Sequence, residues 1–161
     1  MDFEQTVQLY VYDMTKGLAA QLSPMFLGKQ IEGVWHTGVV VYGTEYYYGG
    51  GIEYTTPGTL PMLGLPDKTV ELGTTFIPKD VFLDYLADIS PQYTVETYNL
   101  LEHNCNHFSD DVVQFLTGTR IPSYILDQHK EVLNTPFGAQ LKPLLDSMQG
   151  PSGGSSINGH R

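Results

Sequence analysis

Residues 101–109 read Leu101-Glu102-His103-Asn104-Cys105-Asn106-His107-Phe108-Ser109 and contain the only cysteine of the chain. The residues that follow place four apolar side chains on one face of a helix, at Phe108, Val112, Phe115 and Leu116. Gly118 is predicted to end this helix. The stretch therefore predicts an α-helix whose first turn carries a thiol.

The position of Cys105 at the predicted helix start favours a reactive thiol. Asn104 stands where an N-cap residue would lie, so its side chain can accept a hydrogen bond from the first turn. Unpaired N–H groups and the positive end of the helix macrodipole favour a thiolate at Cys105, and these groups could later hold an oxyanion. Asn104 and Asn106 are candidates for oxyanion binding or positioning. The alternative is a buried structural cysteine, because a free cysteine is often buried and behaves as a small hydrophobe.

A nucleophilic cysteine also needs a base, which usually comes from a distant part of the chain. The five histidines are His36, His103, His107, His129 and His160. His36 is the favoured base because it opens the β-branched run 36–42, which is typical of a core strand and can hold an imidazole rigidly beside a helix start. His103 and His107 are expected to point away from Cys105. For His36 the alternative is a hydrogen-bonded core histidine.

Three other interpretations of the cysteine stretch stay open. A metal site formed by His103, Cys105 and His107 is disfavoured, because their i, i+2, i+4 spacing does not fit one helical face and a fourth ligand is not evident. The sequence therefore predicts no metal and no cofactor. A redox role is limited because the chain has no second cysteine to form an intramolecular disulfide. The third interpretation is a non-catalytic module that binds a ubiquitin-like protein.

The remaining patterns predict further strands and helices around this helix. Alternating apolar residues over 6–13 indicate a strand, and residues 35–42 and 46–49 are predicted to form a hairpin that turns at Gly43 and Thr44. Other predicted elements are a helix over 18–22, a strand over 69–77, a helix from Pro78 to Ile89 with Val81 on its apolar stripe, an extended segment over 121–125, and helices over 127–133 and 138–148.

Gly49, Gly50 and Gly51 follow an aromatic strand and have two interpretations. Three glycines let another backbone approach closely, as a groove that receives an extended peptide would require. Together with Trp35 they are therefore candidates for a substrate groove. A bulge or a flexible loop explains the same glycines without any ligand.

Two separated motifs, residues 33–37 and residues 102–109, together resemble the PPPDE peptidases, a family with a circularly permuted papain fold. The likeness extends over nearly the whole chain, including the stretches 9–13, 22–24, 27–30, 121–125 and 135–138. It implies an α+β, permuted papain-like cysteine protease fold, with a small, mainly antiparallel sheet or barrel packed against helices. His36 and Cys105 match the two positions of the family's catalytic dyad, in which the histidine precedes the cysteine.

The resemblance also implies an activity and partners. It implies a cysteine isopeptidase that removes a ubiquitin-like modifier from target proteins, with SUMO favoured as the modifier. Removal of ubiquitin and hydrolysis of acyl-protein thioesters, as in depalmitoylation, are alternatives that would use the same dyad. The family likeness further implies a homodimer with the active-site groove near the subunit junction. A third catalytic residue is not assigned.

Length and charge limit the remaining function classes. The 161 residues suit one domain over 1–149, followed by a Gly/Ser-rich tail over 150–161 that is expected to be flexible. Lys and Arg number 8 and Asp and Glu 18, and the resulting net charge of −10 would repel nucleic acid. No apolar run suggests a membrane span, and no secretory segment is expected at the start. A free functional thiol suits a reducing compartment, so the expected location is the cytoplasm, with the nucleus as a second candidate location.

Overall fold

The computed structural model describes residues 3–27, 31–133, 143 and 155–157. Its strands form one antiparallel sheet in the order β5-β1-β2-β3-β4-β6. The strands are β1 (Gln5–Asp13), β2 (Trp35–Val41), β3 (Thr44–Tyr48), β4 (Ile52–Thr55), β5 (Lys68–Thr75) and β6 (Ser155–Ser156). The predicted α+β class with a small antiparallel sheet packed against helices is confirmed.

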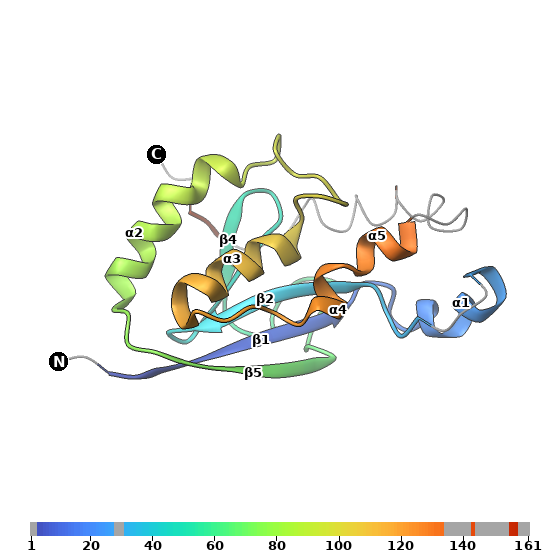
Figure 1. The fold of residues 1–161 in the computed structure, drawn as a ribbon, viewed down its shortest axis with the longest axis horizontal. Coiled ribbons are helices and arrows are strands. Elements are labelled where there is room, and N and C mark those ends of the chain that lie inside the picture. The colour runs from blue at the N-terminus through green and yellow to red at the C-terminus, as the bar shows by residue number, and fades with distance from the viewer. Residues whose placement is uncertain (1–2, 28–30, 134–142, 144–154, 158–161) are drawn as a thin grey trace.

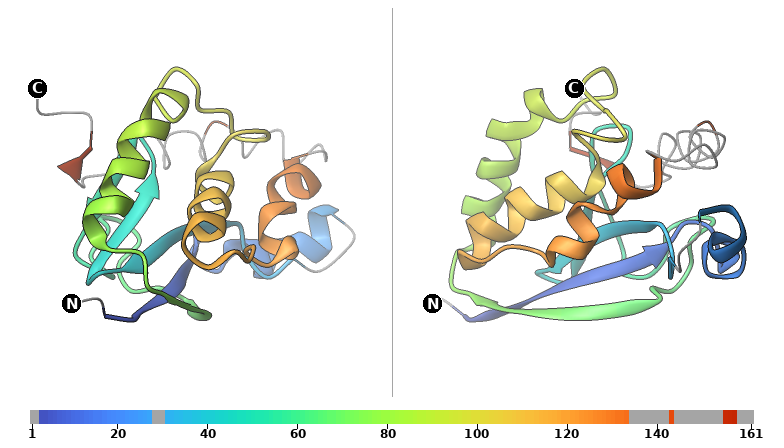
Figure 2. Two further views of the ribbon diagram at one scale, coloured as in Figure 1. Left: turned by 60° about the vertical axis from the view of Figure 1, so that its left-hand side comes forward. Right: turned by 45° about the vertical axis from the view of Figure 1, so that its right-hand side comes forward.

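The helices lie mainly on one side of this sheet. They are α1 (Leu18–Leu27), α2 (Lys79–Ile89), α3 (Cys105–Thr117), α4 (Ser123–Leu126) and α5 (Gln128–Leu133), with a 3-10 turn at Ser90–Gln92. Figures 1 and 2 show α2 to α5 on the same side of β1 and β2, with α1 beyond one end of the sheet. The layers are therefore a sheet and a helical cover that includes the predicted cysteine helix.

The main core lies between β1, β2 and the helices α2 and α3. Alternate residues of β1 point into it, as expected for a strand with one buried face, and Val39 and Val41 of β2 do the same. Helix α3 adds its predicted apolar face, of which Phe108, Val112 and Leu116 are buried and Phe115 is half-buried. This packing presses the first turn of α3 against β2.

Three local predictions need correction. The turn between β2 and β3 lies at Tyr42 and Gly43, one residue earlier than predicted, because both residues adopt positive φ as a type I′ hairpin turn requires. Val81 is exposed on α2, so the buried face of this helix is narrower than the predicted apolar stripe. The chain turns helical at Ser123, directly after Pro122, where an extended segment was predicted.

Two predictions concern the end of the chain. The helix over 138–148 lies outside the described residues, apart from Pro143. Within the tail that was expected to be flexible, Ser155 and Ser156 pair with Tyr54 and Glu53 of β4. The domain boundary at residue 149 stays a prediction. Within the described part of the chain, no helix combines the length and apolar character needed to cross a membrane.

Candidate active site

The start of α3 is fixed by reciprocal hydrogen bonds. Asn104 is the N-cap, and its Oδ1 accepts from the backbone N–H of Asn106 at 2.8 Å and of His107 at 3.4 Å. In return, His107 Nδ1 accepts from the backbone N–H of Asn104 at 3.0 Å, which completes a capping box. Cys105 is therefore the first helical residue, as predicted, and Gly118 ends the helix in a left-handed conformation.

The capping role of His107 was missed from the sequence. A capping box usually carries Glu or Gln three residues after the cap. Here a histidine at that spacing does the same through its ring nitrogen. The Asn-x-x-His spacing was the signal that could have revealed it.

The open end of β2 receives this helix start. Antiparallel pairing between β2 and β3 covers Val39 to Val41, so the preceding residues of β2 are not paired with β3. Asn106 Nδ2 donates to the Trp35 carbonyl at 3.0 Å, and Thr37 Oγ1 lies 2.8 Å from Asn106 Oδ1. The backbone N–H of Thr37 hydrogen-bonds the Cys105 thiol and lowers its pKa. Cys105 thus lies beside the residue that directly follows His36.

Asn106 joins the parts of this site. Its side chain is fully buried, and its Oδ1 lies 3.6 Å from the Cys105 sulfur, which can donate to it. Its Nδ2 is also 3.4 Å from Nδ1 of His129 on α5. Among the predicted site residues, the structure therefore brings Cys105, Asn106 and the Trp35 backbone together. The position of Asn106 suits holding the thiol in place.

Burial dominates the electrostatics of the two candidate dyad residues. Desolvation raises the pKa of Cys105 to about 12, although N–H groups of Thr37, Asn106 and Cys105 itself oppose the change. Burial, and then the nearby His129, lower the pKa of His36 to about 4. The expectation that the helix start would leave Cys105 as a thiolate is therefore wrong for this conformation, because loss of water outweighs the N–H groups. At neutral pH the thiol and the imidazole are both uncharged.

The His36 ring lies against two tyrosines. Tyr12 of β1 is its directly paired neighbour, with ring centroids 5.7 Å apart, and the Tyr47 ring centroid is 6.0 Å away. His36 is buried, with 6% of its surface exposed. Its Nε2 is buried and makes no hydrogen bond to any residue that the structure describes. The alternative of a hydrogen-bonded core histidine therefore finds no partner at this nitrogen among those residues.

The three glycines form the turn between β3 and β4. Gly49 N–H donates to the Gly51 carbonyl at 3.0 Å, and Gly50 N–H donates to the Glu53 carboxylate at 2.8 Å. Gly51 has a φ of 129°, which side-chain-bearing residues rarely adopt. These contacts explain the glycines as a tight turn. Their role in a substrate groove stays a prediction.

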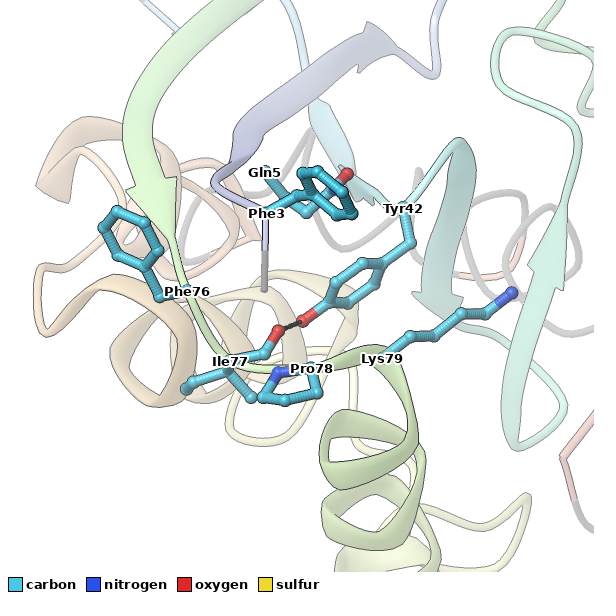
Figure 3. A pocket seen from close by; sticks show the side chains of 7 residues that line it. All are labelled: Phe3, Gln5, Tyr42, Phe76, Ile77, Pro78 and Lys79. Atoms are coloured by element: carbon cyan, nitrogen blue, oxygen red, sulfur yellow. Dashed lines mark hydrogen bonds between the residues drawn. The ribbon is translucent and has the colours of Figure 1, made fainter. Parts of the chain in front are cut away.

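The surface of the described residues includes two hollows, one of which is bordered by a predicted site residue. One, of about 330 Å³, is lined by Ile31, Glu32, Trp35, Lys68, Ser123, Tyr124, Asp127, Gln128 and Glu131. Trp35 is thus the predicted groove residue that borders a hollow, and the Lys68 ammonium lies 4.6 Å from its ring centroid. The other, of about 370 Å³, is shown in Figure 3 and contains none of the predicted site residues. There the Tyr42 hydroxyl donates to the Ile77 carbonyl.

The candidate metal ligands are engaged in other contacts. His103 Nε2 lies 2.7 Å from the Gln92 carbonyl and its ring stacks on Tyr93, while His107 completes the helix cap. In the part of the chain that the structure describes, no three His, Cys, Asp or Glu side chains are grouped as a metal site. The observed contacts give His103 and His107 structural roles.

Comparison with known proteins places the chain in a family. Residues 5–146 match the family model described as "PPPDE putative peptidase domain". The chain is 54% identical over 154 residues to "Desumoylating isopeptidase 1" of Homo sapiens, covering 94% of this chain and 91% of that relative. It is 52% identical over 155 residues to the protein of the same name in Xenopus laevis, with the same coverage. It is 32% identical over 127 residues to "DeSI-like protein sdu1" of Schizosaccharomyces pombe, covering 74% of this chain and 61% of that relative.

The fold and these matches define the class of protein as a cysteine-type hydrolase with a papain-like α+β fold. More particularly, the chain belongs to the PPPDE peptidase family. The resemblance found in the motifs around His36 and Cys105 is confirmed at the level of the family. The roles of the two residues stay predictions.

Proposed function

We propose that this protein is an isopeptidase that removes SUMO from conjugated proteins, with Cys105 as nucleophile and His36 as base. The observation that carries the proposal is the placement of Cys105 at a capped helix start beside β2, the strand that holds His36. The near full-length similarity to relatives named as desumoylating isopeptidases supports SUMO as the modifier.

The reaction begins from two neutral groups. His36 accepts the proton of Cys105, and the sulfur attacks the carbonyl carbon of the isopeptide bond. N–H groups of Thr37, Asn106 and Cys105 favour the thiolate as it forms, and the N–H of Cys105 is the proposed oxyanion donor. The imidazolium then protonates the leaving lysine amine. His36 next deprotonates a water molecule, which hydrolyses the thioester and restores the thiol.

Substrate entry is expected to favour this proton transfer. A buried thiol with a pKa near 12 is a weak nucleophile at neutral pH, because little thiolate is present. The carbonyl carbon of an isopeptide bond beside the sulfur would accept the electron pair of the sulfur as its negative charge develops. Proton transfer to His36 and attack by the Cys105 sulfur are therefore expected to occur close together in time.

Cleavage of defined substrates tests this function. Wild type, Cys105→Ala and His36→Ala would be assayed with a SUMO isopeptide conjugate, the matching ubiquitin conjugate and an acyl-protein thioester. Gln21→Ala, on the exposed side of α1, serves as a control variant. The proposal predicts cleavage of the SUMO conjugate by wild type and Gln21→Ala alone. Cleavage of only ubiquitin or only the thioester would replace SUMO as the substrate, and folded wild type that binds SUMO without turnover would indicate a binding module.

We further propose that the protein forms a homodimer and resides in the cytoplasm and the nucleus. The family likeness supports the homodimer, and the single free thiol supports a reducing compartment. Light scattering on the purified protein would show twice the chain mass if the dimer forms. Imaging of the tagged chain in cells tests the location.

A further inference from the structure

His36 and Thr37 point to opposite faces of β2. Side chains alternate along a strand, and Thr37 contacts Asn106 and Ser109 of α3 through its hydroxyl. His36 therefore points to the other face of β2, where it meets Tyr12 and Tyr47. Cys105 interacts with the Thr37 N–H, and such groups lie near the plane of the sheet at its edge. Side chains from both faces of the sheet can therefore reach this edge of β2.

Glu45 of β3 is a buried acidic residue on the His36 face. It is fully buried, and the Tyr12 hydroxyl lies 2.7 Å from Oε2 and 3.0 Å from Oε1. The Gly58 N–H donates to Oε1 at 3.0 Å. Burial raises the pKa of Glu45, whereas these two hydrogen bonds lower it. A buried carboxyl is costly to keep, so three oriented contacts at one side chain suggest a use beyond packing.

Gly38 lets this carboxyl approach β2. A Cβ atom at Gly38 would overlap the Glu45 side chain, with Oε2 as its nearest atom. Gly38 is two residues from His36 and therefore lies on the same face of the strand. Glu45 thus rests over the backbone next to the imidazole, and Tyr12, the paired neighbour of His36, spans the two.

We propose that Tyr12 and Glu45 form a positioning pair for His36. When His36 takes the proton from Cys105, its Nε2–H donates a hydrogen bond to the Tyr12 oxygen. Tyr12 keeps its own proton and donates a hydrogen bond to Glu45. The carboxylate thereby supports the imidazolium through the tyrosine, and no proton leaves the pair. This gives a partner to the one His36 nitrogen that is buried without a hydrogen bond among the described residues. The inference rests on the proposed role of His36.

The charge on His36 depends on groups from several elements. Tyr12 of β1 and Tyr47 of β3 lie against its ring, and His129 of α5 acts on its charge. Glu45 of β3 is joined to Tyr12 by a hydrogen bond. His129 lowers the pKa of His36, so it opposes the imidazolium. The positioning pair acts in the other direction. Removing it should therefore lower the pKa of His36 further.

The test uses Tyr12→Phe and Glu45→Gln, with Tyr46→Phe as the matched control. Tyr46, on β3, is a buried tyrosine like Tyr12, but it belongs to the core on the other face of the sheet. We expect Tyr12→Phe and Glu45→Gln to lower kcat on a SUMO conjugate by about tenfold or more, with KM nearly unchanged. The rising limb of the pH profile of kcat/KM should move to lower pH. Tyr46→Phe should change neither quantity.

A direct titration keeps this inference separate from the proposed substrate. In a Cys105→Ala background, the pKa of His36 would be followed by NMR with and without Tyr12→Phe. A lower pKa in the folded double variant supports the pair, whether or not SUMO is the substrate. An unchanged pKa in folded protein overturns the pair, as does loss of kcat with an unmoved rising limb, since that pattern marks a merely structural role. If Glu45→Gln fails to fold, Tyr12→Phe decides the outcome.

Discussion

The two halves of β2 differ in what contacts the edge of the strand that faces away from β1. Val39 to Val41 pair with β3, and two of these valines lie in the apolar core. In the first half, the Trp35 carbonyl and the Thr37 N–H contact the start of α3 instead. The difference shows that the candidate site lies where sheet pairing gives way to a capped helix. One strand thus supplies both core packing and chemical groups.

Removing either candidate dyad residue is the strongest way to break this comparison. Cys105→Ala and His36→Ala should each lower kcat/KM by about 1,000-fold or more, because nucleophile and base act as one unit. The double variant should lose little more than each single variant. Val41→Ala, from the paired half, should keep kcat within about twofold while lowering the free energy of unfolding. Equal kcat losses in both halves would contradict the comparison.

Asn106→Ala should affect both stability and activity. Its buried amide contacts Cys105, the Trp35 carbonyl and Thr37, so truncation leaves several polar groups without a partner. We expect a loss of about 2 to 3 kcal/mol in unfolding free energy, and a fall in kcat of about tenfold or more. Urea unfolding and steady-state kinetics measure the two effects. A stability loss without any change in kcat would restrict Asn106 to packing.

The two buried histidines should make the protein sensitive to acid. The folded pKa values of His36 and His129 are about 4, below the ordinary value of 6.5, chiefly because of burial. The contribution of the two neutral histidines to the free energy of unfolding is therefore fully present above about pH 6.5. It falls as the pH decreases toward 4, since the unfolded chain binds protons that the folded chain excludes. By about pH 4.5 the loss should be on the order of 2 to 3 kcal/mol for each histidine. A folded His129→Gln variant should show a shallower decline in urea unfolding. An identical pH dependence would exclude a contribution from His129.

Gly38→Ala should give the smallest effect, at the junction of the two halves. The new methyl group would press on the Glu45 carboxyl, and we expect a loss of about 1 to 3 kcal/mol in unfolding free energy. Gly43→Ala, in the exposed turn, is the control. Its methyl group would meet no atom, but the positive φ should cost about 1 kcal/mol. A smaller loss at Gly38 than at Gly43 would contradict the close approach of Glu45.

Local signals in the sequence predicted the helix that carries the thiol. Asn104, Cys105 and Gly118 took their expected places because caps and stops depend on residues within one turn. The β2–β3 turn was misplaced because Tyr42 adopts a positive φ, which a tyrosine rarely does. Pro122 was taken to extend the chain, yet it precedes a helix, where its fixed φ is also suitable.

The electrostatic state of the site could not be predicted from the sequence. The pKa of Cys105 depends on how completely β2 and the helices exclude water, which is a property of the folded core. The contact between Tyr12 and Glu45 joins residues 33 positions apart through the pairing of β1, β2 and β3. Such contacts follow from strand register, which residue patterns within each strand do not specify by themselves.

Covalent capture tests the central claim most directly. Wild type, Cys105→Ala and His36→Ala would be incubated with SUMO and ubiquitin probes that carry a C-terminal thiol-reactive group, and the intact masses would be measured. The account predicts one SUMO adduct on wild type, none on Cys105→Ala and a much slower adduct on His36→Ala. A wild-type chain that forms no adduct with either probe, and whose Cys105 also resists iodoacetamide at neutral pH, would contradict the account and leave Cys105 as a structural thiol.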